Sequence, residues 1–255
     1  MAGGGISGYV STGPATQLAQ SNDLLERSGQ LEALGAMLDS VRSTSHGRLV
    51  LVTGEAGAGK TALARRFTDE HRESTRILWG ACDALFTPRA LGPLLDVAEE
   101  TGGDLARAAA GDAGPHEVAN ALLRELSRQA PTVLVIEDLH WADEATLDVV
   151  RLLARKADTA PALVLGTYRD DELDLRHPLR VVLGELARAS NIARCELPRL
   201  SPDAVAQLAE PHGIDADELT AARRATRSSS PRSSPAATVR SRRPCATRSS
   251  PARLA

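Results

Sequence analysis

The chain has 255 residues, of which 42% are hydrophobic and 25% are charged, and its formal net charge is −3. Nine of its 30 basic residues follow Glu218, where no acidic residue remains, so the preceding part carries 21 basic and 33 acidic groups. A part this acidic repels polyanions, which argues against direct DNA binding. No segment has the length of a membrane-spanning helix, and the first 20 residues lack the basic start and apolar core of a signal peptide.

The cysteines Cys82, Cys195 and Cys245 lie far apart and have no metal-binding spacing. Free thiols in a reducing compartment are the simplest interpretation. We therefore expect a cytoplasmic protein that has no membrane partner.

Apolar runs and helical patterns alternate along the chain after a flexible leader at 1–21. This alternation predicts an α/β fold, in which a parallel sheet carries helices on both faces. The apolar runs are nearly continuous, which is typical of strands covered on both sides. The expected strands are Arg48–Thr53, Arg76–Ala81, Thr132–Ile136, Ala162–Tyr168 and Ile192–Leu197. The expected helices are Asn22–Val41, Ala62–Glu70, Ala90–Glu100, His116–Gln129, Glu144–Lys156, Pro178–Ala189 and Ala204–Glu210, the last with Ser201 as N-cap.

A complete GxxxxGK[ST] sequence follows the first expected strand and leads into a helix. Its glycines allow the backbone to wrap around phosphate oxygens, and backbone N–H groups with the helix N-terminus supply positive potential. Lys60 is expected to reach the β- and γ-phosphates, and the Thr61 hydroxyl to ligate Mg²⁺. The motif therefore predicts that this chain binds a nucleoside triphosphate. Its residues are Gly54, Glu55, Ala56, Gly57, Ala58, Gly59, Lys60 and Thr61.

Two acidic residues, Glu137 and Asp138, follow the third expected strand. Acids at the carboxyl end of a buried parallel strand face the ligand crevice, where one can hold Mg²⁺ and the other can activate water. In the usual order the first acid meets the metal, which makes Glu137 the metal partner and Asp138 the base. Because Asp more often comes first in such pairs, both residues remain candidates for either role.

The segment after these acids contains His140, Trp141 and Asp143. Asp143 directly precedes an expected helix, so we expect it to cap that helix rather than to belong to the site. Trp141 is expected to pack against the protein rather than on a nucleobase. His140 could lie near the site, but a loop histidine is more often exposed.

The fourth expected strand ends in Gly-Thr-Tyr-Arg-Asp-Asp-Glu-Leu. A polar or cationic group at this strand tip can contact the γ-phosphate. Arg169 is the first candidate for this role and Thr167 the second. The alternative is a surface arginine that pairs with Asp170 or Asp171.

Together with the phosphate loop, the segments EDLHWADEATLDVVRLL and LVLGTYRDDEL resemble the AAA-like, STAND-type ATPase domain of large LuxR-family transcriptional regulators. The segment LLERSGQLEALGAMLD is similar to the box that precedes the phosphate loop in that family. The resemblance covers about residues 24–219. It implies ATP as the nucleotide, an ASCE-type sheet of strand order 5-1-4-3-2, a helical lid and ATP acting as a conformational switch. Family members usually continue to a C-terminal helix-turn-helix, which this sequence does not contain.

These features divide the chain into a leader at 1–21, an ATPase core at 22–199, the start of a lid at 200–222 and a basic tail at 223–255. The tail has the composition of a disordered segment. A shifted reading frame is the alternative that we favour, because permitted codons across Arg223–Pro235 then give TGNPFFVTEVLA, which resembles the segment after the core in this family. The same shift across Arg243–Arg253 gives AVRDAVLARAA.

The function expected from the sequence is a regulatory module that binds Mg-ATP and hydrolyses it slowly. Its expected partners are ATP or ADP, further copies of itself, or intact regulators. A second interpretation is a fragment or scaffold that binds nucleotide without turnover. A third, a P-loop kinase, lacks any recognisable acceptor site in the sequence.

Overall fold

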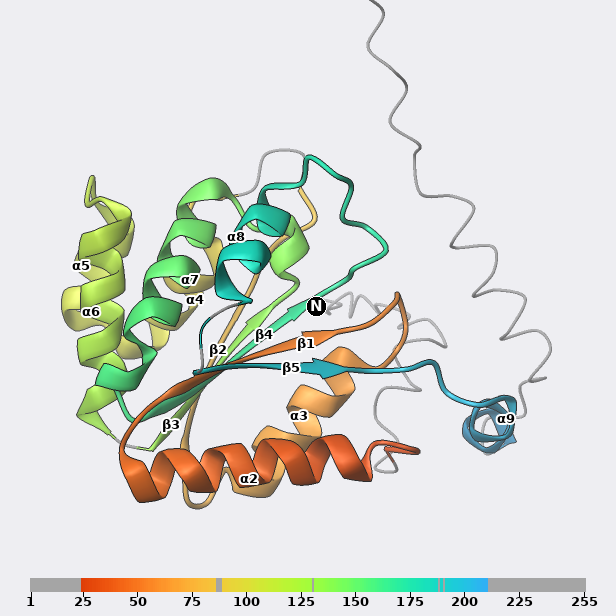
Figure 1. Cartoon of the computed structure of the whole chain (residues 1–255). Helices are drawn as coiled ribbons and strands as arrows, with labels where there is room; N and C mark the ends of the chain where they lie inside the picture. Colours follow the sequence, from red (N-terminus) through yellow and green to blue (C-terminus); the bar gives the residue numbers. More distant parts are fainter. Residues whose placement is uncertain (1–23, 86–88, 130, 188, 190, 211–255) are drawn as a thin grey trace, which may run out of the picture.

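The computed structural model describes residues 24–85, 89–129, 131–187, 189 and 191–210. The expected leader, the basic tail and Cys245 lie outside the described residues, as does all but the first part of the expected lid. Figure 1 shows the whole chain.

Five parallel strands form one sheet in the order β2-β3-β4-β1-β5. This is the expected strand order, and β1 lies between β4 and β5 although it is the first strand in the sequence. All five strands point the same way, so their carboxyl ends meet at one edge of the sheet (Figure 1). The strands are β1 (Arg48–Thr53), β2 (Arg76–Ala81), β3 (Thr132–Glu137), β4 (Ala162–Tyr168) and β5 (Ile192–Glu196).

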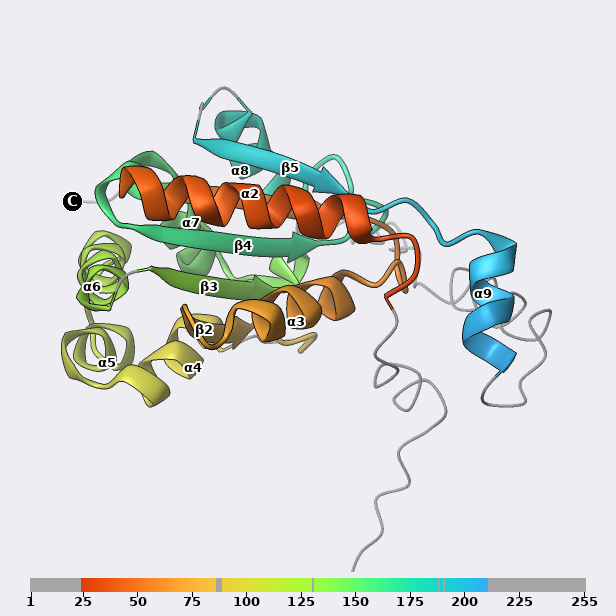
Figure 2. The same cartoon turned by 90° about the horizontal axis from the view of Figure 1, so that it is seen from below.

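Helices cover both faces of the sheet, as the alternating pattern predicts. The pair α2 (Ser28–Thr44) and α3 (Lys60–His71) covers one face, and a separate layer covers the other (Figures 1 and 2). Each face has its own apolar core, since side chains of successive strand residues point to opposite sides. The second layer consists of α4 (Gly92–Thr101), α5 (Gly103–Ala110), α6 (Pro115–Arg128), α7 (Glu144–Lys156) and α8 (Pro178–Leu186).

The predicted elements agree closely with the structure in the centre of the sheet and less closely at its borders. β3 and β4 are buried along their whole length, and β1 along all but its end residues. The two edge strands, β2 and β5, also pack residues against both cores, but they are only partly buried. Helix α5 was not predicted, because its eight residues begin with a glycine that follows another glycine, and the helix is too short to show a clear period.

The sheet and α4 approach each other closely at Gly80. A Cβ atom at this position would lie 2.1 Å from the carbonyl oxygen of Pro93. Only glycine allows this contact, which positions α4 against the end of β2.

Beyond the carboxyl ends of the strands, β5 continues into α9 (Pro202–Ala209), which lies apart from the two helical layers (Figure 2). The hydroxyl of Ser201 accepts a hydrogen bond from Ala204 N at 3.1 Å, so Ser201 is the N-cap as expected.

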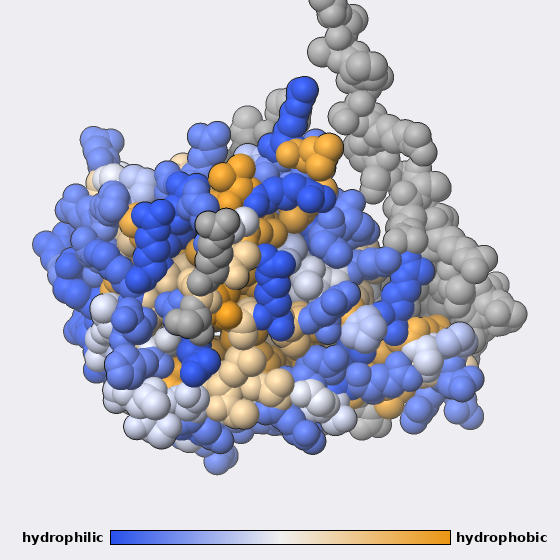
Figure 3. All heavy atoms as spheres, viewed as in Figure 1, coloured by the Kyte–Doolittle hydropathy of each residue, from blue (hydrophilic) through white to orange (hydrophobic). Residues whose placement is uncertain are grey.

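Hydrophilic side chains cover much of the face shown in Figure 3, and apolar residues appear among them in separate patches. None of the helices in the described residues is long and apolar enough to cross a membrane.

Candidate nucleotide-binding site

The phosphate loop lies between the end of β1 and the start of α3, at the edge where the strands end (Figure 1). Gly57 and Gly59 have φ angles of 72° and 93°, a left-handed conformation that glycine adopts without strain. The first hydrogen bond of α3 runs from Leu63 N to Gly59 O at 2.8 Å. The loop therefore ends on a helix N-terminus, whose backbone N–H groups favour anions.

Lys60 is the first residue of α3, and only 7% of it is exposed. Its Nζ donates hydrogen bonds to the carbonyl oxygens of Gly54 at 2.7 Å and Glu55 at 3.0 Å. Burial lowers the pKa of Lys60, and the nearby positive charge of Arg169 lowers it further. The ammonium is thus held inside the loop by the loop's own backbone.

Glu137 is the last residue of β3 and is 8% exposed. Its Oε2 accepts a hydrogen bond from the indole nitrogen of Trp79 on β2, at 3.1 Å. Its Oε1 is buried and has no hydrogen-bond partner within the described residues. A buried carboxylate oxygen without a donor is costly unless a cation or a polar ligand meets it.

Asp138 follows directly, with a left-handed backbone at φ 56° and ψ 47°. Its backbone N–H donates to the hydroxyl of Thr167 at 3.0 Å, which connects the end of β3 to the end of β4. Thr167 therefore supports Asp138 in this structure. Burial raises the pKa of Asp138, and the positive charge of Arg169 partly opposes that shift.

Arg169 follows the last residue of β4 and is held from two sides. Its guanidinium forms an ion pair with Glu172. The alternative considered from the sequence was a pair with Asp170 or Asp171. The Cζ of Arg169 also lies 5.2 Å from the ring centroid of Trp141, within the range of a cation–π contact. Trp141 itself packs against the apolar core, as expected.

His140 corrects the expectation of an exposed loop histidine, because its side chain is 1% exposed. The short 3-10 helix η1 (Leu139–Trp141) turns it inward between two carboxylates. Its Nδ1 lies 3.9 Å from Asp138 Oδ1, and its Nε2 lies 3.3 Å from Glu172 Oε2. Neither contact has hydrogen-bond geometry. Burial lowers the pKa of His140 to about 4, so the imidazole is neutral at pH 7.

Asp143 caps α7, as predicted. Its carboxylate accepts hydrogen bonds from Ala145 N at 3.0 Å and Thr146 N at 3.3 Å. The same carboxylate accepts a bond from Leu91 N at 3.1 Å, directly before α4. Asp143 therefore stabilises the surroundings of the site and does not line it.

The segment that joins β5 to α9 is tied to the phosphate loop by side chains that sequence patterns did not identify. Arg27, which is 2% exposed, donates from Nη2 to Ala58 O at 3.0 Å and to Pro198 O at 2.6 Å. Arg199 Nε donates to the Glu55 carboxylate at 2.6 Å. One signal for Arg27 was present, since it belongs to the segment LLERSGQLEALGAMLD before the phosphate loop.

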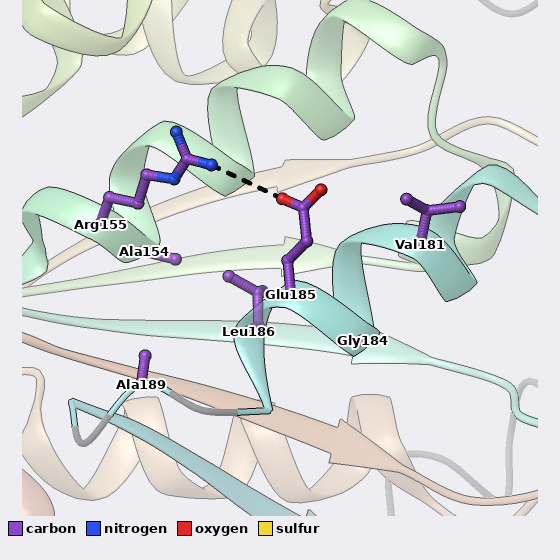
Figure 4. Close-up of a pocket in the computed structure, with 7 residues that line it drawn as sticks. All are labelled: Ala154, Arg155, Val181, Gly184, Glu185, Leu186 and Ala189. Carbon is purple, nitrogen blue, oxygen red and sulfur yellow. Dashed lines mark ion pairs between the residues drawn. The ribbon is translucent and has the colours of Figure 1, made fainter.

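A hollow of about 520 Å³ lies between α7 and α8, away from the phosphate loop (Figure 4). Arg155 and Glu185 face each other across it, 3.7 Å apart. Asn191, which precedes β5, donates to Ala154 O beside it. The hollow therefore lies near the amino ends of the strands, at the opposite end of the sheet from the phosphate loop.

The oxygen atoms near the phosphate loop fit Mg²⁺ that is bound jointly by protein and nucleotide, rather than a metal ion bound by protein side chains alone. No group of three or more His, Cys, Asp or Glu residues in the described ranges could hold a metal ion. Mg²⁺ is usually bound through one or two carboxylates together with nucleotide phosphates and water. The unpartnered Oε1 of Glu137 would suit that arrangement, and Thr61 in the first turn of α3 would supply a hydroxyl.

The sequence profile of the AAA ATPase domain matches residues 23–165, which is more than half of the chain. The chain belongs to the AAA ATPase domain family. Nucleotide binding and hydrolysis are the activities that this family assignment indicates.

Individual relatives are more distant. An uncharacterized protein of Rhizobium meliloti (strain 1021) is 26% identical over an alignment of 215 positions, and the alignment covers 64% of this chain and 20% of that protein. The chain thus spans about a fifth of the length of this relative. The AAA ATPase domain resembles two archaeal structures in fold. These are the Aeropyrum pernix ORC1 protein in complex with DNA (TM-score 0.52, 14% identity, 77% of this chain and 52% of that one) and Cdc6p from Pyrobaculum aerophilum (TM-score 0.52, 15% identity, 74% and 50%).

Proposed function

We propose that this AAA ATPase domain is a regulatory module, which binds Mg-ATP and hydrolyses it slowly as a conformational switch. We place it in a cytoplasmic signalling protein of the LuxR-type transcription-regulator class. The observation that carries the proposal is the position of Lys60, which is buried at the start of α3 beside the ends of β3 and β4. Direct DNA binding is not part of the proposal, because the sequence before the basic tail is acidic.

The phosphate loop supplies the binding step in this proposal. Its backbone N–H groups bind the phosphates, and the Lys60 ammonium moves from the carbonyl oxygens of Gly54 and Glu55 to the β- and γ-phosphates. Thr61 and Glu137 hold Mg²⁺, which neutralises charge on the phosphates when it is bound. This assignment of Glu137 is supported by its unpartnered buried oxygen.

Asp138 is the general base in the proposed reaction, and Arg169 contacts the γ-phosphate. A carboxylate whose pKa is raised is a better proton acceptor at neutral pH than an ordinary aspartate. Asp138 therefore orients the attacking water and accepts its proton. Arg169 stabilises the negative charge of the phosphoryl group during transfer.

The switch itself is proposed from the contacts between the phosphate loop and the chain after β5. Arg27 connects Ala58 of the loop to Pro198, and Glu55 of the loop pairs with Arg199. A change in the loop on nucleotide binding would therefore reach α9, the first helix of the expected lid at 200–222. We also propose, from the sequence pattern, that the ATPase core begins after residue 21 and ends at residue 199.

The test uses Lys60→Ala, which removes the cation facing the phosphates. We expect wild type to bind ATP and this variant to lose detectable binding, as measured by calorimetry in the presence of Mg²⁺. Asp138→Asn should bind ATP normally and hydrolyse it at least about tenfold more slowly. Unchanged ATP affinity in Lys60→Ala would exclude the site. Normal hydrolysis in Asp138→Asn, together with its loss in Glu137→Gln, would reverse the roles of the two acids.

A second candidate function is nucleotide binding without turnover. It is favoured by the observation that Trp79 and Glu172 already engage Glu137 and Arg169. ATP or ADP would then act as a structural ligand, and the module would titrate further copies of itself or intact regulators. Binding without measurable phosphate release would distinguish this function from the first. A kinase function would require phosphoryl transfer to an acceptor faster than to water.

A further inference from the structure

Glu172 lies in the turn after β4 and contacts two residues of the candidate site, although the proposed function gives it no role. Its Oε1 forms the ion pair with Arg169, and its Oε2 lies 3.3 Å from His140 Nε2. Its side chain is 29% exposed, so the carboxylate is largely withdrawn from water. A single carboxylate therefore connects the proposed γ-phosphate contact to the interior of the site.

On its inner side, the Glu172 carboxylate lies against the ring of His140. The imidazole of His140 is enclosed, and its backbone carbonyl lies 3.0 Å from His177 Nε2. His177 is the N-cap of α8, where its Nδ1 accepts a hydrogen bond from Leu179 N. η1 and α8 hold the histidine in place, so its ring closes the space on the protein side of the Glu172 carboxylate.

Arg169 is held in the same place by a second contact, the face of the Trp141 ring at 5.2 Å. A γ-phosphate must therefore compete with a carboxylate for the guanidinium before Arg169 can contact it. The competitor is a single negative charge that is partly shielded from water, where ion pairs are stronger than on an open surface. ADP has no γ-phosphate, so it leaves the pair undisturbed.

We propose that Glu172 is a positioning residue that holds Arg169 away from the terminal phosphate and thereby reduces the preference of the site for ATP over ADP. The inference rests on the proposed function, because it requires that nucleotide binds at the phosphate loop. It concerns regulation of that site: the pair must open whenever the triphosphate is sensed.

The experiment measures the dissociation constants of Mg-ATP and Mg-ADP for wild type and for Glu172→Gln, by calorimetry on the full chain. The substitution keeps the size of the side chain and removes its charge. We expect ATP affinity to rise about three- to tenfold and ADP affinity to stay within about twofold, since a partly exposed ion pair is worth about 1 kcal/mol. The decisive readout is the dissociation constant of Mg-ADP divided by that of Mg-ATP, which should rise about three- to tenfold, because a merely structural effect of Glu172 would change both constants.

The matched control is Glu70→Gln, which breaks another Arg–Glu pair, with Arg66, at the far end of α3. We expect no change in the ratio of the Mg-ADP to the Mg-ATP dissociation constant for this variant. In an Arg169→Ala background, Glu172→Gln should also leave the ratio unchanged, because the guanidinium is gone. If Glu172→Gln does not fold, Glu172→Asp shortens the carboxylate and should raise the ratio by a smaller factor.

The outcomes separate the two proposals. If wild type binds no ATP, or if Lys60→Ala binds it equally well, the proposed function fails and the inference fails with it. If wild type binds ATP through Lys60 but the ratio is unchanged or falls in Glu172→Gln, the function stands and the role of Glu172 is overturned.

Discussion

The indole nitrogen of Trp79 donates a hydrogen bond to Oε2 of Glu137, and this bond joins the side chains of two neighbouring strands at the edge where nucleotide is proposed to bind. The bond supplies a donor to a carboxylate that is buried at the end of β3. One oxygen of Glu137 thus accepts a hydrogen bond from the protein, whereas the buried Oε1 has no hydrogen-bond partner within the described residues. Trp79 was not among the residues that the sequence identified.

Replacing Trp79 with Phe should lower the free energy of unfolding by about 1–3 kcal/mol, because a buried carboxylate oxygen loses its donor. Urea denaturation followed by circular dichroism measures the loss. Trp141→Phe is the matched control, since it keeps an aromatic face for Arg169 and should cost less than about 1 kcal/mol. Equal losses in the two variants would mean that the bond to Glu137 contributes nothing specific.

His140 should make the protein less stable as the pH falls from about 6.5 to about 4. Its pKa is lowered to about 4 in the folded protein, whereas in the unfolded chain it has the ordinary value of 6.5. Between these values only the unfolded chain binds the proton, so acidification favours unfolding by up to about 3 kcal/mol. The charged or titratable groups around the ring are Asp138, Glu172, Arg169, Lys60 and His177.

The measurement compares the free energy of unfolding of wild type and His140→Gln at several pH values. Glutamine does not titrate, so the difference between the two proteins should change across this pH window and level off above pH 7. Parallel curves throughout the window would show that folding does not lower the pKa of His140. Both proteins share every other ionisable group, which removes the general acid effect from the comparison.

Gly80→Ala should destabilise the protein by about 1–3 kcal/mol or more, because the added methyl group would meet the Pro93 backbone at 2.1 Å. Gly35→Ala provides the control within a helix. No atom lies within 4 Å of the added Cβ there, so alanine should stabilise α2 by about 0.5–1 kcal/mol. In thermal denaturation, the melting temperature should fall for Gly80→Ala and rise for Gly35→Ala. A loss of stability in both variants would contradict the close contact between β2 and α4.

Cys82 should be protected from thiol reagents until the protein unfolds. It is 6% exposed, and burial raises its pKa to about 12. Cys195 is less buried, and burial raises its pKa to a smaller degree. In a Cys245→Ser background at pH 8, we expect Cys195 to react first and Cys82 to react at the rate of unfolding, as followed by mass spectrometry. Rapid labelling of Cys82 in the native protein would contradict its burial.

The sequence predicted the elements best where one physical cause dominates. β1, β2 and β4 have the predicted bounds, because a short apolar run between polar borders can be buried in few other ways. The cap at Asp143 was also predicted, since it depends on residues only two and three positions away. These patterns are local, so sequence alone contains them.

Relationships between distant segments were not predicted. The burial of His140 depends on η1 and on Glu172, which lies in another loop. The choice of Glu172 over two nearer aspartates as the partner of Arg169 depends on how the turn after β4 folds. Composition and spacing contain no direct information on either arrangement. The roles assigned to the phosphate loop, Glu137, Asp138 and Arg169 remain predictions until nucleotide binding is measured.

The bond from Arg27 to Pro198 spans 171 residues of sequence and has a consequence for synthesis of the chain. β1 is the first strand that a ribosome makes, yet both of its neighbours in the sheet, β4 and β5, are made last. Proteins are synthesised from the N-terminus, and contacts between distant residues form late. A growing chain therefore lacks the contacts of the phosphate loop with the segment after β5 until Pro198 has left the ribosomal tunnel. Expression fragments should accordingly extend beyond Ser201. Shorter fragments would lack β5, or the Pro198 and Arg199 contacts that follow it.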